Sequence, residues 1–398
     1  MTDAAVSVVV VSRGRPRALA RCLEGLRQLY HRNFEVVVVA DPGGMEVARD
    51  RPIKAVAFDE ANISVARNLG VAAAAGEIVA FIDDDAVPEP TWLDALTAPF
   101  ADAGVAATGG WVRGRNGISY QWTSRVVGPD GRSRPGDVPG PGEAVKTEGT
   151  NMAFRRSVLA GIGGFDPAFR FYLDETDVNL RLARAGYRTV IVPGAQVHHG
   201  FAASAIRRSD RVPMSLRQIG ASLAVFLRRH GDGVDRATRL SQEREEQRQR
   251  LIRHMVAARL MPGDVARLLQ GFDAGCRDGA GRTLGDLPAL GGAVAEFRQF
   301  GTVPGTGHVV IAGRVWQARA KRRAAAEEVG RGRRVTLILL SPTARRHRVA
   351  FTSGGWWEQA GGLFGAAERT EPAMAWWRFG DRVGAEAARA GGYRIAGT

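Results

Sequence analysis

Strand-like hydrophobic runs alternate with helical segments over the first 85 residues, and this alternation limits the folds open to the chain. The runs are VSVVVV (6–11), FEVVVVA (34–40) and EIVAFID (77–83), with a weaker run, IKAVAF, at 53–58. Between them, PRALARCLEGLRQLY and ISVARNLGVAAAA have the spacing of helices that cover a sheet. Strands that alternate with helices form parallel sheets with crossover helices, so we predict an α/β domain.

Polar residues stand at the carboxyl ends of the predicted strands. Ser12 and Arg13 follow the first strand, Asp41 follows the second, and the acidic run Asp83–Asp85 follows the last. Ligands of open α/β sheets bind beyond these ends, so the side chains are expected to converge. Adjacent carboxylates repel one another unless a cation lies between them, and carboxylates one residue apart suit Mg²⁺ or Mn²⁺ bridged to a diphosphate. The alternative is a surface turn that caps the helix at PEPTWLDAL.

A second acidic cluster lies in LDETDVNLRL at 173–182. Helical spacing puts Asp174 and Asp177 on one face and brings Asp177 near Arg181, whereas Glu175 points elsewhere. A carboxylate in a cleft can accept the proton of a sugar hydroxyl during attack. The alternative is a set of acids that favours the first helical turn through the helix dipole. His198 and His199 end the following strand, where they are either Mn²⁺ ligands or structural residues.

Charge and composition leave several partner classes open. The net charge is +14 and the only lysines are Lys54, Lys146 and Lys321, so arginine carries the excess. Arginine suits phosphate recognition, although genome composition can produce the same bias. Nucleic acid, an anionic membrane and acidic substrates all fit this charge. We find no base-stacking or helix-turn-helix pattern and predict no nucleic-acid partner. Cys22 and Cys276 lack metal-ligand spacing.

The ordered motifs resemble family-2 glycosyltransferases of the GT-A fold over about residues 5–200. They are VVVVSRGRPRALARCLEGL, EVVVVADPGG, ANISVARNLGVAAAAGEIVAFIDDD, GTNMAFRRSVLAGIGGFD, LDETDVNLRLARAGY and IVPGAQVHH. The resemblance implies a Rossmann-like nucleotide-diphospho-sugar transferase domain. It also implies sugar transfer from a nucleotide-diphosphate donor, usually with inversion, assisted by Mg²⁺ or Mn²⁺.

The same resemblance assigns roles to individual residues on the donor side. Ser12 and Asp41 would lie near the nucleotide base and ribose, and Arg67 near the base or diphosphate. Asp83 and Asp85 take the places of the two aspartates of the DxD motif, with Asp85 the direct metal ligand. We group Arg13 and Asp84 with the donor-binding residues.

On the acceptor side, the resemblance gives the base by position to Glu175 and by residue type to Asp174, and we favour Glu175. The family's trailing histidine aligns better with His199 than with His198. Gly149 and Asn151 are expected in the sugar or acceptor pocket, together with Asp177. The Gly- and Pro-rich loop at 129–144 is interpreted as a mobile lid or as surface disorder.

We therefore predict a catalytic GT-A domain at 1–205, an Arg-rich helical region at 206–300 and an α/β accessory region with a βαβ-like unit at 301–398. The predicted function is transfer of a sugar to a glycan or lipid-linked acceptor in surface polysaccharide synthesis. The predicted location is cytoplasmic, with peripheral contact at the inner membrane face through the Arg-rich segment 204–230 as an option. Competing interpretations are a catalytically silent nucleotide- or glycan-binding protein and an aspartate-dependent phosphotransferase.

Overall fold

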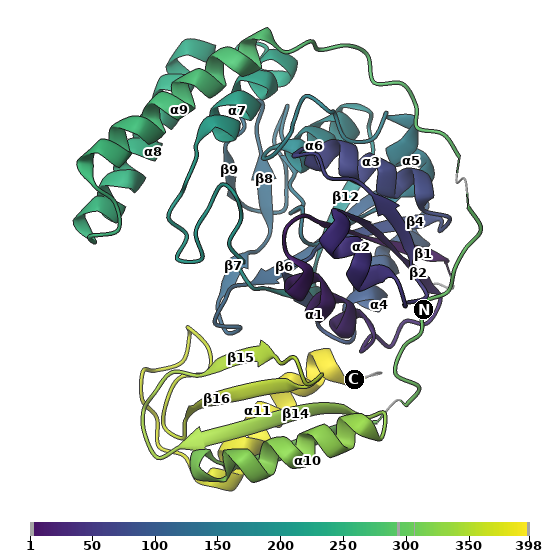
Figure 1. Ribbon diagram of the computed structural model, residues 1–398, viewed down its shortest axis with the longest axis vertical. Helices are drawn as coiled ribbons and strands as arrows, with labels where there is room; N and C mark the ends of the chain where they lie inside the picture. Colours follow the sequence, from purple (N-terminus) through teal and green to yellow (C-terminus); the bar gives the residue numbers. More distant parts are fainter. Residues whose placement is uncertain (1–3, 293–294, 306, 396–398) are drawn as a thin grey trace.

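The computed structural model describes residues 4–292, 295–305 and 307–395, so the predicted outer limits at residues 1 and 398 lie outside the described residues. A mixed sheet forms the centre of the first 200 residues, with strand order β3-β2-β1-β4-β11-β6-β12-β5 and β7 paired to β6 (Figure 1). Its strands are β1 (Val6–Ser12), β2 (Phe34–Ala40), β3 (Lys54–Ala57), β4 (Ile78–Asp83), β5 (Ala86–Pro88), β6 (Val105–Arg113), β7 (Tyr120–Trp122), β11 (Met152–Arg155) and β12 (Arg188–His199).

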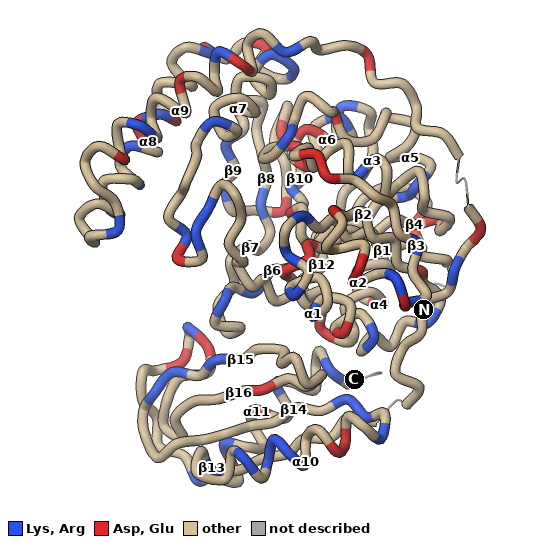
Figure 2. The backbone as a smooth tube through the Cα atoms, in the orientation of Figure 1, with Lys and Arg blue, Asp and Glu red and all other residues tan. Residues whose placement is uncertain are grey.

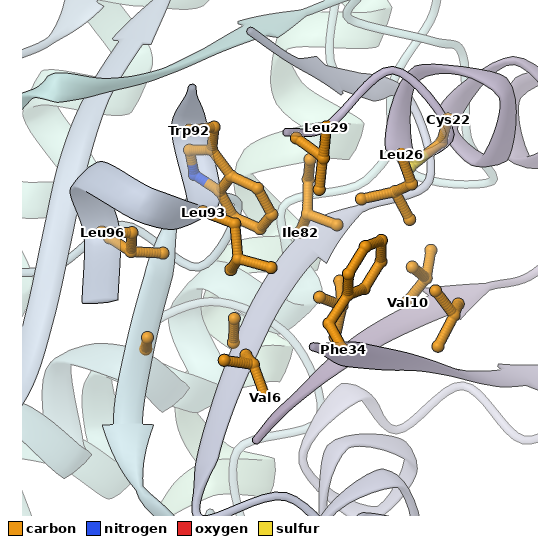
Figure 3. Packing of buried hydrophobic residues seen from close by; sticks show 14 of the residues in the cluster. Val6, Val10, Cys22, Leu26, Leu29, Phe34, Ile82, Trp92, Leu93 and Leu96 are labelled. Atoms are coloured by element: carbon orange, nitrogen blue, oxygen red, sulfur yellow. The ribbon is translucent and has the colours of Figure 1, made fainter. Parts of the chain in front are cut away.

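Helices cover both faces of this sheet because alternate strand residues point to opposite faces. They are α1 (Pro16–Leu26), α2 (Pro42–Ala48), α3 (Ile63–Ala73), α4 (Trp92–Thr97), α5 (Arg156–Gly161) and α6 (Asp174–Arg184), with a 3₁₀ turn at Ala98–Ala101. Val6 and Val10 pack with Leu26 of α1 and Trp92 of α4 on one face (Figure 3). Val9 packs on the other face with residues of α3, α5 and α6. The predicted α/β GT-A-like fold is confirmed.

The order of the strands brings the acidic residues to one sheet edge. β1 to β4 run parallel, so Ser12, Ala40 and Asp83 end neighbouring strands at the same edge. β11 is antiparallel to both β4 and β6, and β12 returns parallel to β6. The last residues of β12 pair with β5, which begins directly after Asp85. His198 and His199 therefore lie beside the end of the acidic run.

The segment predicted as a mobile loop at 129–144 is instead part of a small sheet. Its strands are β8 (Arg125–Val127), β9 (Ser133–Pro135) and β10 (Ala144–Val145). The tip is fastened to the helical region, because Arg239 donates to the Asp130 carbonyl at 3.0 Å and Arg132 pairs with Glu246 at 2.9 Å. The lid interpretation of this loop is therefore not supported by its contacts.

Beyond residue 205 the chain adds helical and sheet elements. The helices α7 (Arg217–His230), α8 (Arg236–Val256) and α9 (Pro262–Gly281) form a projecting group (Figure 1). Residues 298–303 then run back along the first domain, where the Phe300 amide donates to the Phe34 carbonyl at 2.8 Å. The second sheet, ordered β13-β14-β16-β15, consists of β13 (His308–Arg314), β14 (Arg334–Ser341), β15 (Arg348–Phe351) and β16 (Trp357–Gly362). It packs with α10 (Ala318–Gly330) and α11 (Phe379–Arg394).

Candidate metal and catalytic site

Three potential metal ligands meet at the carboxyl edge of the first sheet. One ligand atom each from Asp83, Asp85 and His199 lies within 4.8 Å of the other two. The His199 Nε2 atom is 3.2 Å from Asp85 Oδ1 and 3.9 Å from Asp83 Oδ2. Asp85 is buried, whereas the Asp83 side chain is about a third exposed, at 35%. The group therefore opens to solvent on the Asp83 side.

Neighbouring residues hold the acidic run in place. The Ser12 hydroxyl donates to Asp84 Oδ2 at 2.7 Å, and Arg15 lies 2.7 Å from Asp84 Oδ1. The Ala202 amide donates to Asp85 Oδ2 at 2.6 Å. Burial raises the pKa of Asp84 to about 7 despite Arg15. Burial also opposes ionisation of Asp85, but His199, Arg15 and the Ala202 amide outweigh it and hold the pKa of Asp85 well below its usual range.

The orientation of His199 fits a cation at this position. Its Nδ1 lies 3.1 Å from Gln121 Oε1 and its ring stacks on Trp122 at 5.8 Å between centroids. A cation between Nε2 and the two carboxylates would let the neutral ring, with Nδ1–H donating to Gln121, direct its Nε2 lone pair at that cation. Among the described residues, the buried Asp85 Oδ1 atom has no hydrogen-bond partner. Carboxylate oxygens and an imidazole are acceptable ligands for Mn²⁺, and the carboxylates suit Mg²⁺.

Arg67 connects this group to the second acidic cluster. Its guanidinium pairs with Asp174 and lies 3.8 Å from Asp83. The same side chain donates to the Gly149 carbonyl at 3.0 Å. A Cβ atom on Gly149 would lie 2.5 Å from Arg67 Nη2, so the glycine leaves room for the buried guanidinium. Arg67 and Gly149 thus connect the two clusters that the sequence placed about 90 residues apart.

Asp174 and Glu175 occupy different electrostatic environments at the start of α6. Lys146 donates to Glu175 at 3.1 Å and to Glu148 at 2.9 Å. Burial raises the pKa of Asp174 to about 7, with Arg67 opposing the rise and the Glu175 charge adding to it. Burial also acts to raise the pKa of Glu175, but Lys146 and Arg67 outweigh it, so this pKa lies below its usual value. Glu175 is therefore the more readily ionised of the two.

Four of the predicted ligand-binding side chains are buried and bonded to other protein groups in the structure. The Asp84 side chain is fully buried between Ser12 and Arg15. Asp177 pairs with Arg181 at 2.7 Å and with His230 at 2.8 Å. His198 Nε2 lies 2.7 Å from Glu89, which Arg394 of α11 also pairs with. The fourth residue is Asn151.

Asn151 is a buried connector between strands and a helix. Its Nδ2 donates to the carbonyls of Trp111 at 3.0 Å and Ala195 at 2.9 Å, and its Oδ1 accepts from Trp92 Nε1 at 2.8 Å. These bonds use both amide hydrogens and one lone pair of Oδ1, and the side chain is fully buried, so it is not accessible to a sugar. The segment TEGTN (147–151), which includes the predicted pocket residues Gly149 and Asn151, thus contributes its last residue to the core.

Asn151→Ala is expected to destabilise the protein by at least about 2 kcal/mol, because it leaves the buried indole N–H and two carbonyls without partners. Denaturant unfolding measures the change. Gln249→Ala, at an exposed position of α8, is the matched control and should have little effect. A stable Asn151→Ala protein that has lost only donor or acceptor affinity would restore the pocket assignment.

Two other predicted donor residues have protein partners at the surface of the site. Asp41 caps α2, accepting from the Gly44 amide at 3.0 Å and from the Gly14 amide at 2.7 Å. Arg13 pairs with Asp59 at 2.9 Å, and both side chains are about half exposed. Asp41 therefore joins the loops after β1 and β2, and Arg13 lies at the outer rim.

Three cationic residues of this region were missed from the sequence. Arg15 lies two residues beyond the predicted Arg13, so its place after the first strand was an available signal. Lys146 is one of only three lysines and stands next to the TEGTN motif. Arg207 is half-buried. Burial and the nearby Arg211 lower the pKa of Arg207, and the charges of Asp85 and Asp83 partly offset this effect. Its segment, 204–230, was recognised as Arg-rich but was interpreted as an optional membrane contact and not as part of this site.

Part of the chain matches a known protein family. Residues 7–163 match the model of glycosyl transferase family 2. The chain carries a glycosyl transferase family 2 domain. This family 2 domain includes the acidic run, Arg67 and Lys146, whereas α6 and His199 follow the matched range.

Two curated relatives are similar to this chain in sequence. The glucosyl-dolichyl phosphate glucuronosyltransferase of Haloferax volcanii is 29% identical over 177 residues, covering 40% of this chain and 56% of the relative. The pre-mycofactocin glycosyltransferase of Mycobacterium tuberculosis is 27% identical over 264 residues, covering 59% and 55%. The chain thus spans about half the length of these relatives.

One solved structure with a similar chain path is the mannosyltransferase PcManGT from Pyrobaculum calidifontis in complex with GDP-Man and Mn²⁺. It has 17% sequence identity and a TM-score of 0.42, covering 69% of this chain and 87% of that one.

Within the described residues, no helix combines the length and the apolar character needed to cross a membrane.

Proposed function

We propose that the chain is a metal-dependent, inverting glycosyltransferase. It transfers a sugar from a nucleotide-diphosphate donor to a glycan or lipid-linked acceptor in surface polysaccharide synthesis, on the cytoplasmic side of the cell membrane. The observation that carries the proposal is the grouping of Asp83, Asp85 and His199 at the sheet edge of a family 2 domain. The similarity to a glucosyl-dolichyl phosphate glucuronosyltransferase supports a lipid-linked acceptor.

On the donor side, Asp83, Asp85 and His199 would hold Mg²⁺ or Mn²⁺. Such an ion, when bound, neutralises charge on the leaving nucleoside diphosphate. Arg67, between Asp83 and Asp174, fixes the spacing of the two acidic clusters. Arg207 adds positive charge on the side of the segment that follows β12, which favours an anionic donor.

On the acceptor side, Glu175 is the general base. Its carboxylate accepts the proton of the acceptor hydroxyl while the hydroxyl oxygen bonds to the anomeric carbon and the bond from that carbon to the diphosphate oxygen breaks. Lys146 keeps Glu175 ionised and oriented, because it donates to that carboxylate and to Glu148. Attack from the face opposite to the leaving group inverts the configuration.

The proposal is tested by measuring the binding of UDP, GDP, dTDP and CMP by calorimetry and thermal shift, each with and without Mn²⁺. We expect one nucleotide to bind much more tightly with the metal and to raise the unfolding free energy by about RT ln(1 + [L]/Kd). The corresponding nucleotide sugar is then tested for metal-dependent turnover. Failure of all four nucleotides to bind under both conditions would contradict the proposal and favour a catalytically silent domain.

A further inference from the structure

The carboxyl end of the second sheet carries an exposed apolar surface. Val315, Trp316, Met374 and Trp376 are exposed there to 41%, 68%, 57% and 83%. Val315 and Trp316 directly follow β13, and residues 363–376 follow β16, which is parallel to β13 and β14. The two exposed tryptophans thus come from the same end of the sheet. We call these four residues the tryptophan surface.

The tryptophans are held on a packed support. The Trp376 ring lies 5.0 Å from that of Phe364, and Arg314 lies over both Trp316, at 6.0 Å, and Phe379, at 4.3 Å. Phe364 and Phe379 belong to the same apolar cluster under α11. The exposed indoles are therefore placed around one buried cluster. Exposed aromatic side chains that cannot turn inward are costly in water and usually mark a contact surface.

Basic residues surround the tryptophan surface. Exposed arginines of this part of the chain include Arg319, Arg323, Arg345, Arg346 and Arg378. None of these five forms an ion pair within the described residues, whereas Arg322 of α10 pairs with Glu358 and Arg331, directly after α10, pairs with Glu328. Glu327 is an acid on the same side of α10 as Trp316. Figure 2 shows the basic residues along α10. The surface is thus both aromatic and net cationic.

This combination favours one class of partner. Tryptophan prefers the boundary between lipid headgroups and acyl chains, and arginine is attracted to anionic headgroups. A nucleic acid or an acidic peptide would use the charges but leave Val315 and Met374 without apolar contacts. The sequence suggested α7 as a membrane contact, but this helix is largely buried. It packs closely on α9, since a Cβ atom on Gly275 of α9 would lie only 1.9 Å from the Arg217 carbonyl oxygen of α7. The basic segment 204–230 is therefore a poor candidate for this contact.

We propose that the tryptophan surface and its arginines dock the chain on an anionic lipid bilayer. The indoles of Trp316 and Trp376 insert at the headgroup level and the arginines contact the anionic headgroups. This inference concerns the second sheet and is independent of the donor reaction, because lipid binding needs neither nucleotide nor metal. It also makes the accessory region the part that brings a lipid-linked acceptor near the first domain.

The test is flotation of the full chain with vesicles of phosphatidylcholine containing about one-third phosphatidylglycerol, against phosphatidylcholine alone. We expect salt-sensitive binding to the anionic vesicles only. The double variant W316S/W376S should bind roughly ten-fold more weakly or worse. The variant R345Q/R346Q should lose about five-fold per arginine. V256S, which changes another exposed apolar residue, at 79% exposure, should bind like the wild type.

These variants alter exposed side chains, so equal thermal unfolding confirms that each is folded. The proposal is overturned if the wild type does not bind anionic vesicles, or if W316S/W376S binds as well as V256S. It is also overturned if a soluble polysaccharide, and no vesicle, changes the tryptophan emission of the wild type. Nucleotide binding in the same preparations is expected to be unchanged, so that a failure of docking and a failure of the proposed reaction are distinguished.

Discussion

Asp85→Asn is expected to abolish the stabilisation of the protein by Mn²⁺ and to lower turnover by roughly 10³-fold. Asp85 is the most firmly held of the three potential ligands, fixed by the Ala202 amide and facing His199 at 3.2 Å. Loss of one charged group that stabilises a leaving diphosphate costs on the order of 10²–10³ in rate, and loss of the ion adds to this cost. Wild type at about 100-fold excess of Mn²⁺ over its Kd should gain about 2.7 kcal/mol of stability, and the variant almost none.

The comparison of each protein with and without Mn²⁺ separates metal binding from the cost of the substitution itself. His198→Gln is the matched control, since His198 neighbours His199 on β12 but bonds to Glu89. It should keep the Mn²⁺-induced shift, even where its own stability is lower. If His198→Gln loses that shift while Asp85→Asn keeps it, the metal binds near His198 and not at the group formed by Asp83, Asp85 and His199.

The convergence of the strand ends was predictable because it follows from topology alone. Valine-rich runs that alternate with helices give parallel strands, and parallel strands bring Ser12, Asp41 and Asp83 to one edge. No long-range detail is needed for that inference. The same argument explains why the sequence predicts the βαβ-like unit near residues 308–341 but not the role of that unit.

The sequence did not distinguish side chains that face the site from neighbours that face the core. Asp84 lies between two aspartates that help form the site, yet its carboxylate is buried against Ser12 and Arg15. His198 is bonded to Glu89 instead, and Arg394, the other partner of Glu89, lies 305 residues further along the chain. Contacts at such a separation leave no local pattern, so they appear only in the folded chain.

The pH profile of turnover distinguishes the two acids at the start of α6. A general base acts only when deprotonated, so the rate rises with pH through its pKa. If Asp174 were the base, the rate would rise through about pH 7, where burial places its pKa. Glu175 has a lowered pKa because Lys146 and Arg67 outweigh its burial. We therefore expect turnover to be flat from about pH 6 upward, with any loss confined to more acidic solution.

Glu175→Gln should lower kcat by about 10²–10⁴ while leaving the donor Kd almost unchanged, because the amide fills the same space but cannot accept the proton. Glu148→Gln is the matched control: Glu148 binds the same Lys146 at 2.9 Å, so this variant disturbs the lysine without removing the proposed proton acceptor. It should lose about ten-fold or less. Equal losses in the two variants would assign the effect to Lys146 and its charge balance. A nearly active Glu175→Gln, combined with a pH profile that rises near 7, would instead assign the base role to Asp174. Arg67, which pairs with Asp174, would then have to release it during turnover.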